Sequence, residues 1–389
     1  MTETVEYNKI HAMAYARKLV MQKFGSNLLY FWPMADDSVF IRDLMRQKPL
    51  CASGVGLQQP GMLDYSIDLQ SAGYISDVTP DRSIGGSQSS TSLMGWRALQ
   101  LTPGIWRALR LYFNQYSTSS DINLYVAPSN LSPASVPSQA IMSQQLTKAY
   151  GAQYIEWTLP YVLNLQDTSR WLYYSSSDGE VSYSNSGAAD DVIKEWTGSA
   201  WTASTFYWRG NLFGLDAATW PSYDTFTVEL WVDRVDTVPW NGTALAIADA
   251  TEAKARLYVT SAQKVEGTFK NTNGDLYTPA STRTLHPGFN LLTLSYQKGV
   301  AVKLGVNGVV VDTRTPSNYG LFNTALALGI GAQMLTGKTT SGQLKNALVD
   351  DVFLAKGVVT DADLWDIYMS YLTAAPLMQV EGAEKVVLS

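Results

Sequence analysis

The stretch Phe226-Thr-Val-Glu-Leu-Trp-Val-Asp233 decides the fold, because apolar and polar side chains alternate along most of it. An extended strand sends successive side chains to opposite faces, so this pattern puts one face on a core and the other in water. The pattern returns in Asn290-Leu-Leu-Thr-Leu-Ser-Tyr296 and Val300-Ala-Val-Lys-Leu-Gly-Val306, and Gly, Asn and Pro separate such runs along most of the chain. The sequence therefore predicts an all-β protein built as a sandwich.

The length and composition predict more than one domain with a large core. A chain of 389 residues exceeds the usual domain size of roughly 100 to 200 residues, so we expect two domains plus terminal segments. Hydrophobic residues make up 46% of the chain, whereas charged residues make up 16%, below the globular average of about 25%. The surface should therefore be polar mainly through Ser, Thr, Asn and Gln.

The charge pattern and the cysteine count argue against several kinds of site. The chain has 28 Lys and Arg against 34 Asp and Glu, a net charge of -6. No cluster of basic residues could neutralise a row of phosphates, so nucleic acid is not expected as a partner. Cys51 is the single cysteine and His11 and His286 are the two histidines, so we expect neither an internal disulfide nor a structural zinc site.

The first residues and the hydropathy predict where the protein is made. Residues 1–8 lack the basic and apolar regions of a secretion signal, and no run approaches the ~20 apolar residues of a membrane span. We therefore expect a soluble protein made in the host cytoplasm. Sandwiches rich in Tyr, Trp, Ser and Asn usually work outside cells. Release by lysis would explain how a protein of this composition leaves the cell without a secretion signal. Virion proteins of bacteriophages leave cells in that way.

An amphipathic helix is predicted near the N-terminus. Between residues 7 and 24 a rough helical stripe of apolar side chains is formed by Ile10, Met13, Ala14, Val20, Met21 and Phe24. We expect Gly25 to end the helix, and we assign residues 1–26 to an N-terminal helix or docking arm. Two roles stay open: the helix covers an open end of the sandwich, or it docks onto a neighbouring subunit.

Two parts of the chain carry the motifs of one known family. Leu28-Leu-Tyr-Phe-Trp-Pro-Met-Ala-Asp36 runs from an aromatic strand through Trp-Pro into an acidic turn, and a Gly-rich loop and a strand ending Gly-Tyr-Ile75 follow. Residues 226–233, 288–296 and 303–312 supply later strands of the same pattern, the last with an Asn-Gly pair typical of a type I′ hairpin. This order resembles the laminin-G-like domains of the concanavalin A-like jelly roll.

The resemblance covers residues 27–80 and 216–372, and the gap between them is too long for a loop of a compact domain. We therefore expect a folded insertion at residues 85–205. Its short alternating runs predict a second, smaller β-sandwich. The expected fold is an all-β, concanavalin A-like jelly-roll sandwich split by this insertion, with an N-terminal helix and a short C-terminal helix.

The C-terminal helix is predicted from its own capping pattern. Thr360 can cap the helix, and Asp363 occupies the capping-box position three residues on. One face of the helix would consist of Leu364, Ile367, Tyr368 and Tyr371. Residues 373–389 form a C-terminal arm, for which pairing with a neighbour's sheet edge and a frayed tail both stay open.

The residue patterns of a hydrolase are missing from the sequence. Retaining glycosidases need two carboxylates about 5 to 5.5 Å apart, and no Glu-x-Asp-x-Glu strand occurs. Asp350 and Asp351 belong to the closing strand, where structural hydrogen bonding is favoured over a cation site. His11 and His286 have no neighbouring Ser or Cys pattern. We therefore expect no catalytic residues and no enzymatic activity.

Calcium is the one ion that the resemblance implies, since laminin-G-like domains often hold it at a loop end. Asp36 and Asp37, after Trp32-Pro33, are the candidate ligands. The competing interpretation is a solvated acidic turn.

Aromatic residues of the insertion are the candidate ligand-binding groups. Sugar rings have apolar C–H faces that lie flat on Trp or Tyr. The candidates are Trp196, Trp201, Tyr173 and Tyr183. The same residues could instead fill a core or form a protein interface.

Two functions of different classes remain. The first is a structural component of a bacteriophage virion, a capsid decoration or tail adhesion protein, whose partners are its own copies, other virion proteins and host-surface glycans. The second is a stand-alone lectin or the accessory domain of a glycan-processing enzyme.

Overall fold

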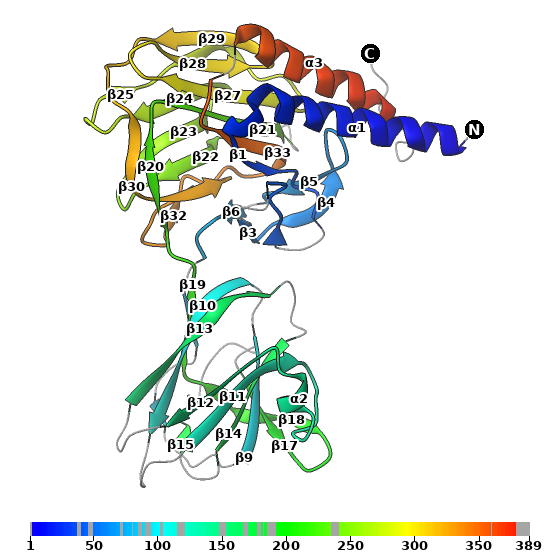
Figure 1. Ribbon diagram of the computed structural model, residues 1–389, viewed down its shortest axis with the longest axis vertical. Coiled ribbons are helices and arrows are strands. Elements are labelled where there is room, and N and C mark those ends of the chain that lie inside the picture. Colours follow the sequence, from blue (N-terminus) through cyan, green and yellow to red (C-terminus); the bar gives the residue numbers. More distant parts are fainter. Residues whose placement is uncertain are drawn as a thin grey trace. The chain divides into compact units, whose positions relative to one another are not determined.

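The computed structural model describes residues 2–36, 40–45, 50–70, 73–79, 81–84, 88–89, 95–101, 104–114, 121–147, 153–165, 170–176, 180–181, 183–184, 192–234, 241–358 and 360–378. The chain forms two compact units. Unit 1 comprises Met1–Val78 with Asp216–Ser389, and unit 2 comprises Thr79–Leu215. Each unit is built from antiparallel sheets that enclose a core (Figure 1). The predicted all-β class is confirmed.

The first sheet of unit 1 combines strands from both ends of the chain. Its order is β29-β28-β27-β21-β33-β5-β4, and β1 also pairs with β33. Its strands are β1 (Leu28–Trp32), β4 (Gly56–Pro60), β5 (Tyr65–Asp68), β21 (Thr225–Arg234), β27 (Asn290–Gln297), β28 (Ala301–Val306), β29 (Val309–Arg314) and β33 (Ala347–Ala355).

The second sheet of unit 1 lies opposite the first. Its order is β2-β3-β6-β30-β22-β23-β24-β25, with β20 paired to β30 and β26 to β24. Its strands are β2 (Phe40–Ile41), β3 (Leu50–Ser53), β6 (Tyr74–Ser76), β20 (Ala218–Tyr223), β22 (Gly242–Ala248), β23 (Ala253–Val259), β24 (Lys264–Lys270), β25 (Leu276–Tyr277), β26 (Ala280–Thr284) and β30 (Leu321–Ile330). A small hairpin, β31 (Gln333–Met334) with β32 (Thr340–Ser341), lies beyond β30 in the chain.

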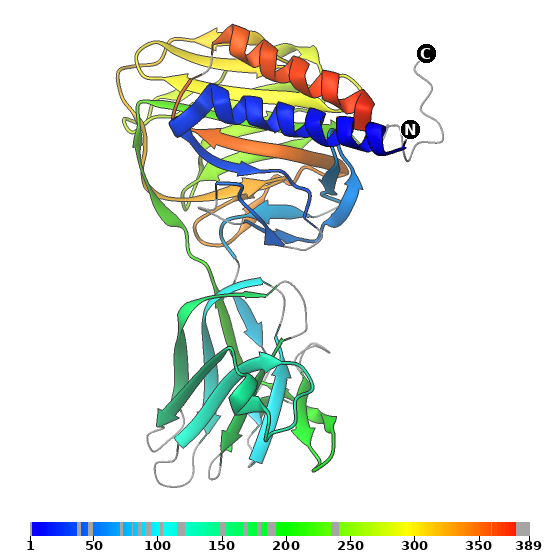
Figure 2. The same ribbon diagram turned by 45° about the vertical axis from the view of Figure 1, so that its right-hand side comes forward.

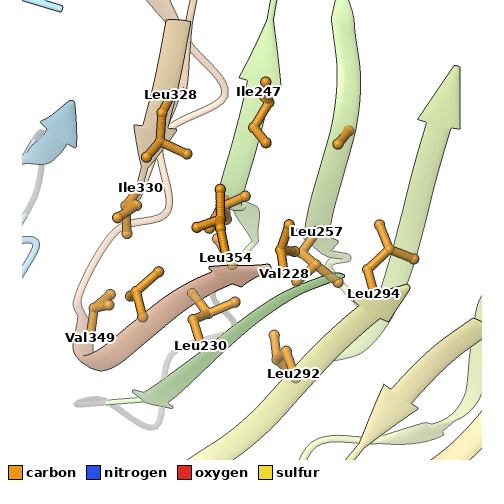
Figure 3. Close-up of a cluster of buried hydrophobic side chains, with 14 of the residues drawn as sticks. Val228, Leu230, Ile247, Leu257, Leu292, Leu294, Leu328, Ile330, Val349 and Leu354 are labelled. Carbon is orange, nitrogen blue, oxygen red and sulfur yellow. The ribbon is translucent and has the colours of Figure 1, made fainter. Parts of the chain in front are cut away.

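The core of unit 1 lies between these two sheets. Val228 and Leu230 of β21 point into it, and Ile247 and Leu328 meet them from the second sheet (Figure 3). All four side chains are fully buried. Burial of each such side chain contributes about 1.5–3 kcal/mol, so the alternating pattern of the sequence specifies this layer strongly.

Strand β1 brings the start of the chain against its last strand. Phe31 lies opposite Phe353 in antiparallel register, and Ile67 of β5 lies opposite Val349 of the same strand. The opening residues and the closing third of the chain therefore share one sheet and one core.

Unit 2 is inserted between β6 and β20, two strands that both pair with β30. Ser76 of β6 pairs with Gly329, and Ala218 of β20 pairs with Leu326, both in antiparallel register. The two pairs are three residues apart on β30, roughly 10 Å at the usual rise per strand residue. The chain thus leaves unit 1 and re-enters it at neighbouring points of the same edge.

Unit 2 consists of a third and a fourth sheet. The third runs β13-β10-β19-β7, with β15 also on β10, and the fourth runs β12-β11-β14-β9-β17-β18-β16-β8. The strands of the third sheet are β7 (Arg82–Ile84), β10 (Gly104–Asn114), β13 (Gln153–Leu165), β15 (Glu180–Val181) and β19 (Gly210–Gly214). Those of the fourth are β8 (Gln88–Ser89), β9 (Gly95–Gln100), β11 (Asp121–Pro128), β12 (Met142–Thr147), β14 (Arg170–Ser176), β16 (Tyr183–Ser184), β17 (Val192–Trp196) and β18 (Trp201–Trp208).

The limits of unit 2 are wider than the predicted 85–205. Ser83 of β7 lies opposite Asn211 of β19, and β19 in turn pairs with β10. The Thr79 N–H donates to the Leu215 carbonyl (3.3 Å), which closes the base of the unit. Residues 82–84 and 210–214 lie outside the predicted limits but form strands, because backbone pairing needs no apolar side chains.

Two helices cover the outer face of the first sheet, side by side (Figures 1 and 2). They are α1 (Thr2–Phe24) and α3 (Asp361–Met378), and α1 leads through a 3₁₀ turn (Gly25–Asn27) into β1. Val20 and Phe24 of α1 and Ile367 and Tyr371 of α3 are buried there with Trp231. The N-terminal helix therefore covers a sheet face rather than an open end, and it is packed into unit 1 rather than forming a separate arm.

The C-terminal helix begins as predicted and ends later. The Thr360 hydroxyl accepts the Asp363 N–H (3.1 Å), and the Asp363 carboxylate accepts the Thr360 N–H (3.3 Å). The helix continues past the predicted end at residue 372 to Met378, and residues 379–389 lie outside the described part of the chain.

The predicted Asn-Gly hairpin joins β28 to β29. Asn307 and Gly308 have φ angles of 53° and 75°, as a type I′ turn requires. A Cβ at residue 308 would lie 2.8 Å from the Cβ of Tyr368, so glycine also permits the close approach of α3.

The helices bury the face of β21 that the alternating sequence pattern predicts to be exposed to water. Glu229 and Trp231 on that face are fully buried. Burial raises the pKa of Glu229 to about 8, with the nearby Thr293 hydroxyl opposing the rise. Neither carboxylate oxygen makes a well-formed hydrogen bond to another described residue. The expectation of a water-facing side was wrong because a second layer covers it.

A buried ion network fastens α1 to this face. The Arg17 guanidinium donates to Asp351 (2.8 Å) and to Asp64 (3.0 Å), and the Tyr371 hydroxyl donates to Asp351 (2.5 Å). Asp350 accepts two backbone N–H groups (2.6 and 2.7 Å). Burial raises the pKa of Asp351, and the Arg17 charge opposes that rise. The two aspartates therefore serve structural bonding, which is the interpretation that the sequence favoured.

We predict that unit 1 folds without unit 2. Deleting residues 79–215 and joining Val78 to Asp216 should leave a β-rich protein that unfolds cooperatively, because the deletion removes no strand of either sheet of unit 1. Circular dichroism and urea unfolding would measure this. Loss of the cooperative transition would contradict the insertion.

We predict that Arg17→Met lowers the free energy of unfolding by about 3–5 kcal/mol, because Asp351 would stay buried without its counter-charge. Lys18→Met, on an exposed position of the same helix, should change it by no more than about 0.5 kcal/mol. Urea unfolding at neutral pH compares the two, and equal effects would show that the network contributes nothing.

Candidate functional site

A polar cleft with a volume of about 490 Å³ lies in unit 1. It is bordered by the β22–β23 hairpin, the turn after β24 and the start of β30. Its charged lining residues are Asp249, Glu252, Lys254 and Lys270, and its uncharged polar ones are Asn271, Thr272, Asn273, Asn323 and Thr324.

The charged side chains of the cleft neutralise one another. Lys254 Nζ lies 2.9 Å from Asp249 and 2.7 Å from Glu252, and Lys270 Nζ lies 2.5 Å from Glu252. Partial burial acts to raise the pKa of Asp249, but hydrogen bonds from Lys254 and the hairpin backbone hold it below its ordinary value. Hydrogen bonds from Lys254 and Lys270 lower the pKa of Glu252. Both carboxylates therefore stay ionised near neutral pH, and the four charges sum to zero.

The turn between β24 and β25 forms a rigid wall of the cleft. The Asn271 side-chain oxygen accepts the N–H groups of Asn273 (3.0 Å) and Asp275 (2.9 Å), and its amide donates to Ser317 (2.8 Å). Hydrogen bonds from Ser317 and Asn271 lower the pKa of Asp275. Residues 271–275 thus form a hairpin turn between β24 and β25, and their hydrogen bonds fix its shape.

The opposite wall contains a strained piece of backbone. Phe322 and Asn323 have φ angles of 71° and 83°, a region that bulky residues rarely adopt. The Phe322 ring is buried and packs edge-on against Phe226 at 5.0 Å and Trp220 at 5.7 Å. The buried ring holds the kink in place, and Asn323 and Thr324 are exposed at the cleft.

The cleft suits a neutral ligand that carries many hydroxyl groups. Amides, hydroxyls, carboxylates and ammonium groups surround it, so it offers both donors and acceptors of hydrogen bonds. The Phe322 ring points into the core, so a ligand in the cleft would contact polar groups.

Of the two candidate calcium ligands the structure describes Asp36, which follows β1 in unit 1 and is not part of the cleft lining. Asp36 is buried and accepts the backbone N–H and the Nε–H of Arg42, both at 2.7 Å. Asp37 lies outside the described residues. Within the described ranges, no three His, Cys, Asp or Glu side chains are grouped so that they could hold a metal. Asp36 is therefore a buried carboxylate paired with the largely exposed Arg42 rather than a solvated side chain, and the calcium site stays a prediction.

Three of the four aromatic candidates come together on the outer face of the fourth sheet. The ring centroid of Trp201 lies 5.4 Å from that of Tyr173 and 5.4 Å from that of Trp196. Tyr173 is fully buried, and its hydroxyl donates to the Pro128 carbonyl (2.6 Å), so it is unsuited to ligand contact. Trp196 and Trp201 are half-buried, and the side chain of Tyr183 lies outside the described part of the structure.

Sequence reasoning missed the cleft residues. Lys254, Lys270 and Asn323 belong to no motif in the sequence that would mark them as members of one site. The positive φ of Asn323 does not change the hydrophobic pattern of its strand. The ion pairs of Lys254 and Lys270 join residues of different strands, so they cannot be recognised from spacing along the sequence. Only the Asn-rich turn itself could have indicated the site.

A second hollow, of about 530 Å³, runs between α1 and α3. Tyr15 and Trp365 flank it with exposed fractions of 61% and 46%, and Met369 is exposed beside them. Neither helix is long and apolar enough to cross a membrane, and the same holds for the rest of the described helical residues.

Comparison with known proteins identifies part of the chain. Residues 209–364 match the model of the concanavalin A-like lectin/glucanases superfamily. This stretch contains the strands that flank the polar cleft. The resemblance to a laminin-G-like, concanavalin A-like jelly roll is therefore confirmed. No curated protein sequence matches the chain.

Solved structures with some similarity include a neurotoxin domain and a pentraxin. The binding domain of botulinum neurotoxin DC in complex with SialylT is 14% identical with a TM-score of 0.30, over 38% of this chain and 36% of that one. The native heptameric SAP-like pentraxin from Limulus polyphemus is 12% identical with a TM-score of 0.33, over 39% of this chain and 73% of that one. The match thus spans well under half of the neurotoxin domain.

Proposed function

We propose that the concanavalin A-like sandwich of unit 1 binds a neutral carbohydrate in its polar cleft, without catalysis. The observation that carries the proposal is the charge-balanced array of donors and acceptors in a cleft of about 490 Å³. Vicinal sugar hydroxyls both donate and accept hydrogen bonds, and such an array matches them. The name of the superfamily, which joins lectins and glucanases, supports the same ligand class.

The carboxylates of the cleft support binding rather than hydrolysis. A glycosidase needs one carboxyl group whose pKa is raised, so that it can donate a proton to the leaving group. The pKa values of Asp249 and Glu252 are both lowered, and both groups are paired with lysines. Neither is suited to act as the acid.

We predict that Asn323→Gly weakens glycan binding several-fold. Glycine keeps the left-handed backbone but removes the amide, and one lost neutral hydrogen bond costs about 0.5–1.5 kcal/mol. Asn346→Gly is the matched control, because Asn346 also has a positive φ (53°) and does not line the cleft. A glycan array followed by calorimetry on the whole chain measures the effect. Equal affinities for the two variants would contradict a site in the cleft.

We further propose that the protein is a structural component of a bacteriophage virion, in which glycan binding attaches the particle to its host. The composition supports this role: a polar, aromatic-rich β protein with one cysteine. A stand-alone lectin is the alternative.

The groove between α1 and α3 supports assembly with a second copy of this chain. A two-fold contact needs projecting and hollow features on one patch, and Trp365 and Tyr15 project beside the hollow. Asp366 of α3 lines the hollow and lies 2.9 Å from Lys23 of α1, so charges of both signs lie beside the apolar groups. Exposed apolar patches of this kind mark protein contacts.

We predict that Trp365→Lys shifts an oligomer toward monomers, because a charge in the groove would lose its hydration on contact. Tyr319→Lys is the control, since Tyr319 is 48% exposed and does not line the groove. Sedimentation velocity measures both variants. A wild-type chain that is monomeric at all concentrations would rule out this contact.

A further inference from the structure

The outer face of the fourth sheet in unit 2 carries a group of half-buried aromatic rings. Side chains of the opposite face, Leu124 and Leu172 among them, fill the core of unit 2. The outer face carries rings instead, because strand neighbours alternate between faces. We call the half-buried rings on this face, Trp96, Tyr125, Trp196 and Trp201, the aromatic shelf.

Buried groups hold the shelf in position. Trp171 and Tyr173 lie beneath it, and the short helix α2 (Val136–Gln139) packs beside it (Figure 1). The Tyr173 hydroxyl accepts the Leu131 N–H (3.1 Å), and the Trp201 indole donates to the Leu131 carbonyl (2.7 Å). These bonds fasten the segment that carries α2 to the sheet, so the shelf is preorganised rather than loosely exposed.

Trp96 and Tyr125 form the centre of the shelf. Their ring centroids are 5.7 Å apart and their planes are inclined by 23°, so they stack and present nearly parallel faces. Ser175 lies opposite Trp96, and Asn123 lies opposite Ser175 in the sheet. Since Asn123 is two residues from Tyr125, its amide is on the same face. Polar groups therefore lie directly beside the ring faces.

The register keeps carboxylates away from this centre. Glu195 alternates with Lys194 and Trp196 along β17, and its carboxylate lies 3.7 Å from Arg97, which alternates with Trp96 along β9. Lys194 Nζ lies 5.0 Å from the centre of the Trp171 ring, a cation–π contact. Ring faces flanked by an amide and a hydroxyl suit a ligand with an apolar face and a polar edge.

We propose that the aromatic shelf is a second carbohydrate site, which takes the pyranose rings of a neutral oligosaccharide. The C–H faces of the sugar would lie on Trp96 and Tyr125, with hydroxyls directed to Asn123 and Ser175. The ligand class is that of the proposed function, but the shelf is built from other residues, in another unit. The intact chain should therefore bind two sugar molecules.

The test uses the intact chain, calorimetry and three free probes: cellohexaose, maltohexaose and chitotetraose. Trp96→Ala and Tyr125→Ala should each weaken the shelf site about tenfold, whereas Tyr125→Phe keeps the ring and should keep the affinity. Tyr65→Ala, at an exposed aromatic of unit 1 that lines neither the cleft nor the groove, is the control. Urea unfolding shows that each variant is folded.

The two sites are separated by their variants. If Asn323→Gly weakens one site and Trp96→Ala the other, both proposals hold. If Trp96→Ala and Tyr125→Ala leave affinity and stoichiometry unchanged, the shelf is not a sugar site, whatever the cleft binds. If they alone abolish binding, the shelf stands and the cleft proposal fails. Absence of binding of every probe at millimolar concentration would overturn the shelf.

Discussion

The pairing of β1 with β33 is the contact on which the rest of unit 1 depends. It sets residues 28–32 against residues 352–355, with more than three hundred positions of sequence between them. Such distant pairing has a high entropic cost of loop closure, which burial between two sheets must offset. Once the two ends are joined, the middle of the chain must leave and return. The edge of β30 is where it does so, and unit 2 can fold as a guest with a core of its own.

The helical layer has a second consequence for where function can lie. Because α1 and α3 cover the first sheet, the strands β21 and β33 are buried on both faces, and their polar side chains become part of the interior. Arg17, Asp351 and Tyr371 form a satisfied network there, whereas Glu229 stays protonated at neutral pH through its raised pKa. Neither group faces a ligand. In unit 1 the surfaces that we propose for recognition are instead the polar cleft and the groove between the helices.

The two proposed carbohydrate sites divide the chemistry of sugar recognition between them. The cleft supplies charged groups and amides, and its aromatic ring is buried in the core, so it would recognise the positions of sugar hydroxyls. The aromatic shelf supplies ring faces flanked by the Asn123 amide and the Ser175 hydroxyl, so it suits the apolar face and polar edge of a sugar. Multivalent attachment to a glycan-covered surface gains from two modest sites on one chain, because the second binding event is intramolecular.

The sequence by itself determined the all-β class, the capping of α3 by Thr360, the Asn307-Gly308 hairpin and the need for an insertion between the two parts of the jelly roll. These follow from local rules, since strand alternation, capping pairs and turn residues act over a few neighbouring positions. Only the tertiary structure decided that α1 covers a sheet face, that Glu229 is buried, that Tyr173 is a support rather than a contact residue, and that Lys254, Lys270 and Asn323 share a cleft. Those outcomes depend on which surfaces, distant in the sequence, pack against each other. Whether a side chain is exposed depends on the layer that covers it, and the hydrophobic pattern of a single strand carries no information about that layer.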